Sequence, residues 1–203
     1  MLDIPLRPLK DDVLGPLVRG PLRAVPPLLI TGAALAAALG AGLAAWRSGP
    51  AVAVSLWLLS RLADGLDGAV ARHQGGASDR GGLVDIVADT IGYAAVPLGI
   101  AAGIDTREVW VVVAVLLATF YVNAVSWTYL AALLEKRAMG AAASGATTST
   151  TMPRGLVEGT ETILFFTLAL AWPAAAPEVL AVMAVAVGIT VAERLWWSRA
   201  ILE

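Results

Sequence analysis

The sequence contains no cysteine and a single histidine, His73, among its 203 residues. The lack of cysteine excludes disulfide bonds, thiolate-ligated zinc and thiol nucleophiles. We expect His73, which lies in a glycine-rich stretch, to be a solvated loop residue with no required chemical role. Charge is also scarce, since charged residues make up 15% of the chain and the net charge is -2. This balance excludes a broad basic surface, and we expect no nucleic-acid partner.

Apolar residues, by contrast, make up 58% of the chain, and the mean hydropathy is +0.77, outside the range of soluble proteins. A helix needs about 20 largely apolar residues to cross a bilayer. The sequence therefore predicts an all-α, polytopic membrane protein whose single domain covers residues 1–203. Its six transmembrane helices are expected near 26–46, 51–72, 82–104, 108–134, 156–173 and 176–197.

Basic residues are unevenly divided between the two sides that six such helices create. If the termini and the even-numbered connections share one side, that side collects all of the 14 Lys and Arg residues except Arg47 and Arg107. The positive-inside rule then predicts that both termini lie in the cytoplasm. Residues 1–25 carry charges and prolines where a cleavable signal peptide would be apolar. We expect them to form a short interfacial helix on the cytoplasmic leaflet.

Two patterns inside the predicted spans favour helix packing over ligand binding. Gly32, Ala36 and Gly40 recur four residues apart in the first span, which is a spacing suited to close helix contact. Asn123 and Ser126 lie three apart in the fourth span, where they can hydrogen-bond to another helix. We interpret both patterns as packing features.

Asp64, Asp67, Asp85 and Asp89 lie within one 26-residue stretch, DGLDGAVARHQGGASDRGGLVDIVAD, at the junction of the second and third spans. A carboxylate at bilayer depth costs about 2.5 to 3.5 kcal/mol, so a cluster needs compensation by cations or water. Asp64 and Asp67 are three apart, and Asp85 and Asp89 are four apart, so each pair shares a helix face. Oxygen-only ligation favours magnesium, manganese or calcium, and a two-metal centre suits a phosphoryl group.

The residues between the acids are also compatible with a phosphate ligand. Gly65 and Gly68 remove side chains where a ligand would approach the backbone, and Arg72 offers a planar fork that can pair with phosphate. Each has a simpler explanation, because glycine is common in packed membrane helices and topology alone places arginine at a cytoplasmic helix end.

Together these residues resemble the signature of the CDP-alcohol phosphotransferase family, D-x-x-D-G-x-x-A-R, eight residues, then G-x-x-x-D-x-x-x-D. Every fixed position is present. The opening MLD, the stretch LVDIVAD and the segment GLVEGTETILFF further resemble small bacterial inner-membrane members of the family. The positions that match the signature are Asp64, Asp67, Gly68, Ala71, Arg72, Gly81, Asp85 and Asp89.

The resemblance implies a function and a set of site residues. The implied reaction transfers a phosphatidyl group from CDP-diacylglycerol to a small polar alcohol with release of CMP, in the cytoplasmic membrane of a bacterium, by a homodimer. It implies two divalent cations, Mg or Mn, with Asp89 both sharing metal ligation and acting as the general base. The implied metal ligands are Asp64, Asp67, Asp85 and Asp89, and the implied nucleotide-binding residues are Asp64, Gly68, Ala71, Arg72 and Gly81.

The acceptor pocket is less defined by the sequence. Arg154, Glu158 and Glu161 lie at the predicted start of the fifth span, and Arg194 lies near the end of the sixth, on the side of the four acids. The arginines are candidates for an acceptor phosphate or a lipid head group. The glutamates are candidates for acceptor hydroxyls or an ammonium group, or they pair with the two arginines.

Two other functions fit the same residues. The pocket could transfer a CDP-alcohol onto diacylglycerol, which reverses the roles of lipid and alcohol. The acids could instead form the permeation site of a divalent-cation transporter. A transporter predicts acids near the middle of the membrane, whereas here they lie at the helix ends with Arg72 between them.

Overall fold

The structure is a computed structural model that describes residues 15–76, 78–139 and 155–202. These residues form helices and connecting turns without any strand, so the all-α prediction is confirmed for the described part of the chain. The elements are α2 Pro27–Trp46, α3 Pro50–His73, α4 Asp79–Ile104, α5 Arg107–Lys136, α7 Gly159–Ala171, the short η1 Pro173–Ala175 and α8 Ala176–Leu202.

Local sequence signals explain where several helices begin. Pro27 and Pro50 start α2 and α3, at positions where the missing backbone N–H carries no penalty. Ser78 caps α4, since its Oγ accepts a hydrogen bond from the Gly81 N–H at 3.1 Å. Thr106 caps α5 in the same way, with its Oγ1 3.3 Å from the Val109 nitrogen. The connection between α3 and α4 is therefore short and ends at a defined cap.

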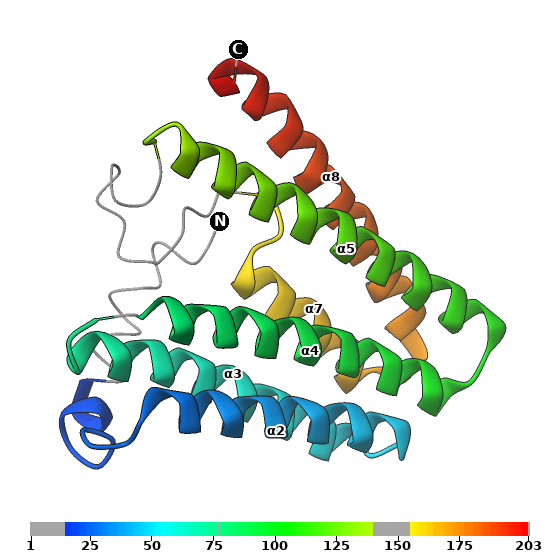
Figure 1. Cartoon of the computed structure of the whole chain (residues 1–203). Helices are drawn as coiled ribbons and strands as arrows, with labels where there is room; N and C mark the ends of the chain where they lie inside the picture. Colours follow the sequence, from blue (N-terminus) through cyan, green and yellow to red (C-terminus); the bar gives the residue numbers. More distant parts are fainter. Residues whose placement is uncertain (1–14, 77, 140–154, 203) are drawn as a thin grey trace.

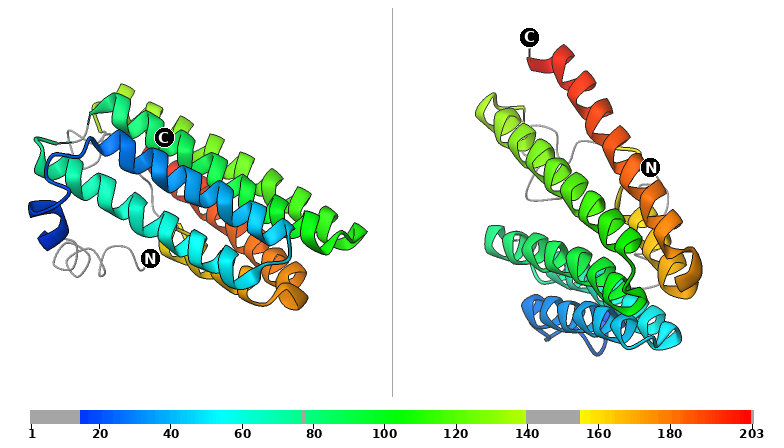
Figure 2. Two further views of the ribbon diagram at one scale, coloured as in Figure 1. Left: turned by 90° about the horizontal axis from the view of Figure 1, so that it is seen from below. Right: turned by 90° about the vertical axis from the view of Figure 1, so that its right-hand side faces the viewer.

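The helices pack in two groups joined by α7 (Figures 1 and 2). One group contains α2, α3 and α4, and in the other α5 packs along α8. The short helix α7 contacts both α3 and α8 and so links the groups. The turn from α3 into α4 brings the C-terminal end of the first helix beside the N-terminal end of the second, where the acidic stretch lies.

Small residues allow α2 and α4 to pack backbone against backbone. A Cβ on Gly99 would overlap the carbonyl oxygen of Gly42, and a Cβ on Gly92 would lie 3.0 Å from the Ala38 Cβ. Of the packing stripe expected at Gly32, Ala36 and Gly40, Gly40 makes a close contact within the chain, because its Cβ position lies 3.2 Å from Leu56 Cδ1 of α3, whereas Gly32 has nothing within 4 Å of its Cβ position. The buried face of α2 instead carries Thr31, Ala34, Ala38, Ala41 and Gly42.

An aromatic cluster fills the centre where the two groups meet. Trp57 on α3 is fully buried, and its ring lies 5.4 Å from that of Phe166 on α7 and 6.1 Å from that of Tyr93 on α4. Phe120 on α5 adds a fourth ring, 6.2 Å from Phe166. Edge contacts of this kind stabilise packed aromatic rings beyond the area they bury. The cluster lies next to the acidic residues of α3 and α4, since Trp57 precedes Asp64 on α3 and Tyr93 follows Asp89 on α4.

Six spans are not confirmed, because in the described part of the chain four helical segments have the length and apolarity to cross a membrane. The helix α3 is long enough to cross a membrane, but every segment of it with the required length contains Arg61, Asp64 and Asp67. These three charges make α3 too polar to qualify. The 13 residues of α7 reach about 20 Å, which is less than the hydrocarbon thickness of about 30 Å. The four qualifying segments are Pro27–Trp46, Asp79–Ile104, Arg107–Lys136 and Pro173–Leu202.

Part of the expected interfacial helix of residues 1–25 lies outside the described residues. Residues 15–19 are helical and lead into turns before α2. Val18 is buried against Ile30 of α2 and Val70 of α3. Gln74 holds the following segment, because its Nε2 donates to the carbonyls of Arg23 and Val25 at 3.0 and 2.9 Å. This segment is therefore docked next to the end of α3 that carries the acids.

Candidate active site

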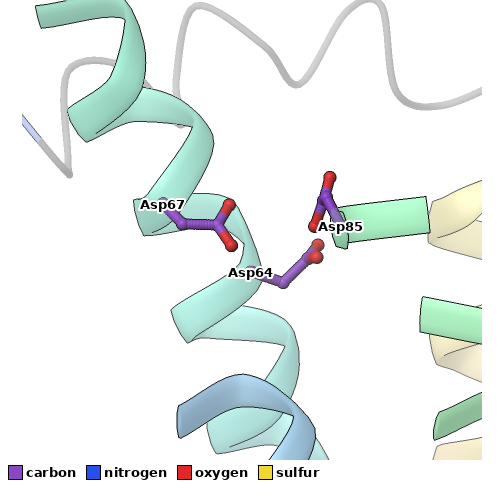
Figure 3. Close-up of side chains that lie close together, drawn as sticks. All are labelled: Asp64, Asp67 and Asp85. Atoms are coloured by element: carbon purple, nitrogen blue, oxygen red, sulfur yellow. The ribbon is translucent and has the colours of Figure 1, made fainter. Parts of the chain in front are cut away.

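Three of the four acids converge where α3 meets α4 (Figure 3). Asp64 and Asp67 project from α3, and Asp85 projects from α4 toward them. One carboxylate oxygen from each lies within 4.8 Å of the others. Carboxylates gathered this closely repel one another unless a cation lies between them. The geometry therefore provides three oxygen donors around one small volume.

The surroundings of these side chains fit a bound divalent cation. Asp67 is only 5% exposed, and the buried Oδ1 of Asp85 has no hydrogen-bond partner. A buried polar atom without a partner is costly, and a metal ion would supply the missing interaction. Oxygen-only donors favour Mg or Mn over zinc. These residues are thus suited to hold a hard divalent cation.

Thr31 of α2 supports this centre, and its role was not recognised from the sequence. Its Oγ1 donates a hydrogen bond of 2.6 Å to Asp67 Oδ2, and the pair is buried. Such a contact leaves Oδ1 of Asp67 for a metal and fixes the orientation of the carboxylate. The available signal was a hydroxyl residue on the same helix face as Ala34 and Ala38, in an otherwise apolar span.

Asp89 lies apart from the three converging acids. Its Oδ1 accepts a hydrogen bond of 2.7 Å from Nη1 of Arg61, with which it forms an ion pair. The antiparallel course of α3 and α4, which both pack on α2, explains this partner. If Asp64 meets Asp85, the residue one turn earlier on α3 faces the residue one turn later on α4. The sequence shows Arg61 only as one of the basic residues on the predicted cytoplasmic side, and the pairing of α3 with α4 identifies Asp89 as its partner.

The expected nucleotide-binding residues line the end of the same helix pair. A Cβ on Gly68 would lie 3.3 Å from Nη1 of Arg72, so the glycine leaves room for this exposed guanidinium. Gly81 lies in the first turn of α4, where the Ser78 cap approaches its Cβ position to 3.0 Å. Ala71 is half-buried on α3. Their role in nucleotide binding remains a prediction.

The two glutamates expected in the acceptor pocket cap helix α7. Glu158 is the N-cap residue, and its side chain also accepts from the Gly155 N–H at 3.2 Å. Glu161 accepts from the Glu158 N–H at 3.1 Å and completes a reciprocal capping box. Glu158 therefore precedes the helix, and both side chains bond to the backbone at its start.

The remaining acceptor candidates are the two late arginines. Arg194 of α8 is 5% exposed, and its Nη1 donates to Asn123 Oδ1 at 2.7 Å and to Ser126 Oγ at 2.6 Å. The hydrogen bonding expected for Asn123 and Ser126 across helices is confirmed, and it joins α5 to α8. The Nε of Arg194 is buried without a hydrogen-bond partner. Arg154 lies outside the described residues.

Sequence comparisons connect this site to known proteins. The family model for CDP-alcohol phosphatidyltransferases matches residues 24–196. The inner membrane protein YnjF of Escherichia coli (strain K12) is 39% identical over 121 residues, which represent 58% of this chain and 55% of YnjF. The match thus spans about half the length of that curated relative.

Solved structures agree with this relationship. The phosphatidylinositol phosphate synthase PgsA1 of Mycobacterium tuberculosis with CDP-DAG bound has a TM-score of 0.68 and 26% identity, over 89% of this chain and 90% of PgsA1. The same protein in complex with manganese and citrate has a TM-score of 0.64 and 27% identity, over 89% and 86%. Because the family model covers the acidic signature and most of the helices, the chain belongs to the CDP-alcohol phosphatidyltransferase family.

Proposed function

We propose that this protein transfers the phosphatidyl group of CDP-diacylglycerol to a small polar alcohol and releases CMP. The observation that carries the proposal is the convergence of Asp64, Asp67 and Asp85 within 4.8 Å, with a buried oxygen of Asp85 unsatisfied, in a chain of this family. The similar PgsA1 structures with CDP-DAG and with manganese support the donor and the metal requirement.

In the proposed reaction the hydroxyl oxygen of the alcohol bonds to the phosphorus that carries the diacylglycerol. The bond from that phosphorus to the oxygen shared with the CMP phosphate breaks, and CMP leaves. Asp89 accepts the hydroxyl proton on its carboxylate. Two divalent cations, Mg or Mn, held by the acids would polarise the phosphate oxygens and stabilise the developing charge. Gly68, Ala71, Arg72 and Gly81 bind the nucleotide.

The acceptor side of the site is assigned to the late arginines. The unsatisfied Nε of Arg194 leaves one donor available to an anionic group, and we propose it for the acceptor or the lipid head group. Arg154 is proposed for the same role. Glu158 and Glu161 already have a task in capping α7, so their proposed contact with acceptor hydroxyls is secondary to it.

The proposed assembly is a single-domain homodimer in the cytoplasmic membrane of a bacterium, with both termini and the acids on the cytoplasmic side. The inner-membrane relative supports the compartment. An active site at this end of the helices would let CMP and a soluble alcohol exchange with the cytoplasm while the acyl chains stay in the bilayer.

Lipid mass spectrometry on reconstituted protein tests the reaction. Vesicles would contain the purified chain, CDP-diacylglycerol, Mn²⁺ and a pool of polar alcohols, and we expect one new phosphatidyl alcohol together with CMP. A product that forms only from a CDP-alcohol and diacylglycerol would reverse the assignment of donor and acceptor. Metal flux unaffected by CDP, without any lipid product, would favour a cation transporter.

Two acid-to-amide variants make the matched pair for this assay. Asp64→Asn removes a charge at the proposed metal centre and should abolish product formation. Asp105→Asn makes the same chemical change at the opposite end of α4, where Asp105 accepts from Trp110 Nε1 at 3.1 Å. It should leave the rate unchanged, because asparagine also tolerates the left-handed backbone at this position.

A further inference from the structure

A buried arginine outside the family signature lies beside the acidic centre. Arg61 is 8% exposed and sits one turn before Asp64 on α3. Its Nη1 donates to Asp89 Oδ1 at 2.7 Å and lies 3.9 Å from Asp64 Oδ2, and its Nη2 donates to Ser60 Oγ at 2.9 Å. One guanidinium thus contacts acids of both helices that form the centre.

Two aromatic rings hold the guanidinium in place. Its central carbon lies 4.8 Å from the ring centroid of Trp57 and 5.3 Å from that of Tyr93. Trp57 is itself fully buried and donates from Nε1 to the Ile163 carbonyl at 3.4 Å, which ties it to α7. The rings attract the cation through their faces and exclude water from it. Arg61 is therefore a fixed charge, since neither ring can move without disturbing the aromatic cluster.

This fixed charge has two opposite effects on the centre. It offsets part of the negative charge of the four carboxylates before any metal binds, which helps the empty site to stay assembled. It also repels a divalent cation held by Asp64, Asp67 and Asp85, because the guanidinium is within 4 Å of the Asp64 carboxylate. Arg61 must therefore weaken metal binding relative to the same centre without it.

The hydrogen bond to Asp89 explains why such a charge is useful. Arg61 occupies Oδ1 of Asp89 and so restricts the rotation of the carboxylate, while Oδ2 is left for a metal or for the acceptor hydroxyl. We propose that Arg61 is a positioning residue that orients Asp89 for catalysis at the expense of metal affinity. The effect on turnover rests on the proposed function, whereas the effect on metal binding does not.

Substitution by an apolar residue of similar length separates the two effects. Arg61→Met should bind Mn²⁺ roughly tenfold more tightly than the wild type, because the repelling charge is gone. Its kcat should fall roughly 10- to 100-fold, because the orientation of Asp89 is lost, with little change in KM for CDP-diacylglycerol. Mn²⁺ binding is measured from the electron paramagnetic resonance signal of free Mn²⁺, and turnover from CMP release. Simple structural damage would instead weaken binding and turnover together.

Conservative and control variants complete the test. Arg61→Lys keeps the charge but lacks the planar fork whose two nitrogens bond Asp89 and Ser60 separately, so its Mn²⁺ affinity should stay near that of the wild type while kcat falls. Arg47→Met makes the same chemical change at an exposed arginine, stacked 5.3 Å from the ring of Trp46 away from the acids, and should change neither quantity. If Arg61→Met does not fold, Arg61→Gln removes the same charge with the same expected tightening.

Several outcomes would overturn the proposal. Weaker or unchanged Mn²⁺ binding in the folded charge-removing variants would refute the electrostatic part. Wild-type turnover in Arg61→Met or Arg61→Lys would refute the positioning part. If neither Arg61→Met nor Arg61→Gln folds, the turnover of Arg61→Lys decides whether Arg61 positions Asp89. A wild-type protein that binds Mn²⁺ yet makes no lipid would refute the proposed function, while the Mn²⁺ comparison would still test the charge of Arg61.

Discussion

The four carboxylates of the centre differ in what each side chain touches. Asp64, Asp67 and Asp85 share a small volume that suits a cation, and Asp67 is further held by Thr31. Asp89 lies one helical turn further along α4, about 6 Å by helix geometry, and is held by a guanidinium. Position along the helix thus assigns different environments to acids that look equivalent in the sequence.

This difference predicts distinct effects of two amide substitutions. Asp89→Asn should retain Mn²⁺-dependent binding of the CDP donor but lose turnover by about 100-fold or more, because an amide cannot accept the hydroxyl proton. Asp64→Asn should lose metal and donor binding together. Binding is measured with labelled CDP-diacylglycerol and turnover by CMP release. A folded Asp89→Asn protein with a near-wild-type rate would disprove the base assignment.

The buried contact between Thr31 and Asp67 gives a second prediction at this scale. Thr31→Val has nearly the same shape but cannot donate to Asp67 Oδ2, so Mn²⁺ affinity should fall about tenfold. Thr31→Ser keeps the hydroxyl and should stay close to the wild type. Equal Mn²⁺ affinity in the valine and serine variants would show that the hydrogen bond does not orient the ligand.

Among the elements, α7 depends on the capping box that Glu158 and Glu161 form. Glu161→Gln keeps a side-chain acceptor for the Glu158 N–H and removes the charge, whereas Glu161→Ala removes both. We expect the glutamine variant to match the wild type in stability and rate, and the alanine variant to lose about 0.5 to 2 kcal/mol. Thermal unfolding and CMP release test this. A higher KM for the alcohol in a stable Glu161→Gln protein would instead indicate acceptor contact.

The close packing of α2 on α4 makes the next prediction. Gly99→Ala places a Cβ against the carbonyl oxygen of Gly42, so the helices must separate, and we expect a loss of about 1 to 3 kcal/mol in unfolding free energy. Gly32→Ala is the matched control, because its Cβ meets nothing within 4 Å. It should leave stability unchanged or raise it by up to about 1 kcal/mol. Unfolding in detergent, followed by circular dichroism, compares the two, and equal stability would contradict the close contact.

For the whole molecule, the predicted orientation can be tested directly because the chain has no cysteine. Arg80 and Arg107 are both exposed. Arg80 lies in the first turn of α4, and Arg107 starts α5, next to the other end of α4. In intact spheroplasts an impermeant maleimide should label Arg107→Cys, and Arg80→Cys should be labelled only after permeabilisation. The reverse pattern would place the acids outside the cytoplasm and remove the proposed access of CMP to that compartment.

Much of this architecture could be predicted from the chain, and the exceptions have physical causes. The lengths of apolar runs located α2, α3, α4, α5, α7 and α8, but α7 is shorter than its apolar stretch because Glu158 caps it late and the chain bends at Trp172. Of the expected packing stripe, Gly40 meets Leu56 of α3 but Gly32 meets nothing within 4 Å, since helical spacing identifies a face without saying which neighbour meets it. Small residues on α4, such as Gly99, decide that α2 turns a different face inward.

The sequence by itself determined the family and the helical membrane character and singled out the four acids as candidates, because these depend on residue type and spacing along single helices. The tertiary structure alone decided which carboxylates meet, and it placed Thr31 on Asp67 and Arg61 on Asp89. Those contacts join residues 36 and 28 positions apart. These contacts depend on which faces of α2, α3 and α4 meet and on how far the helices are shifted along one another. Periodicity within one helix carries no information about these two quantities.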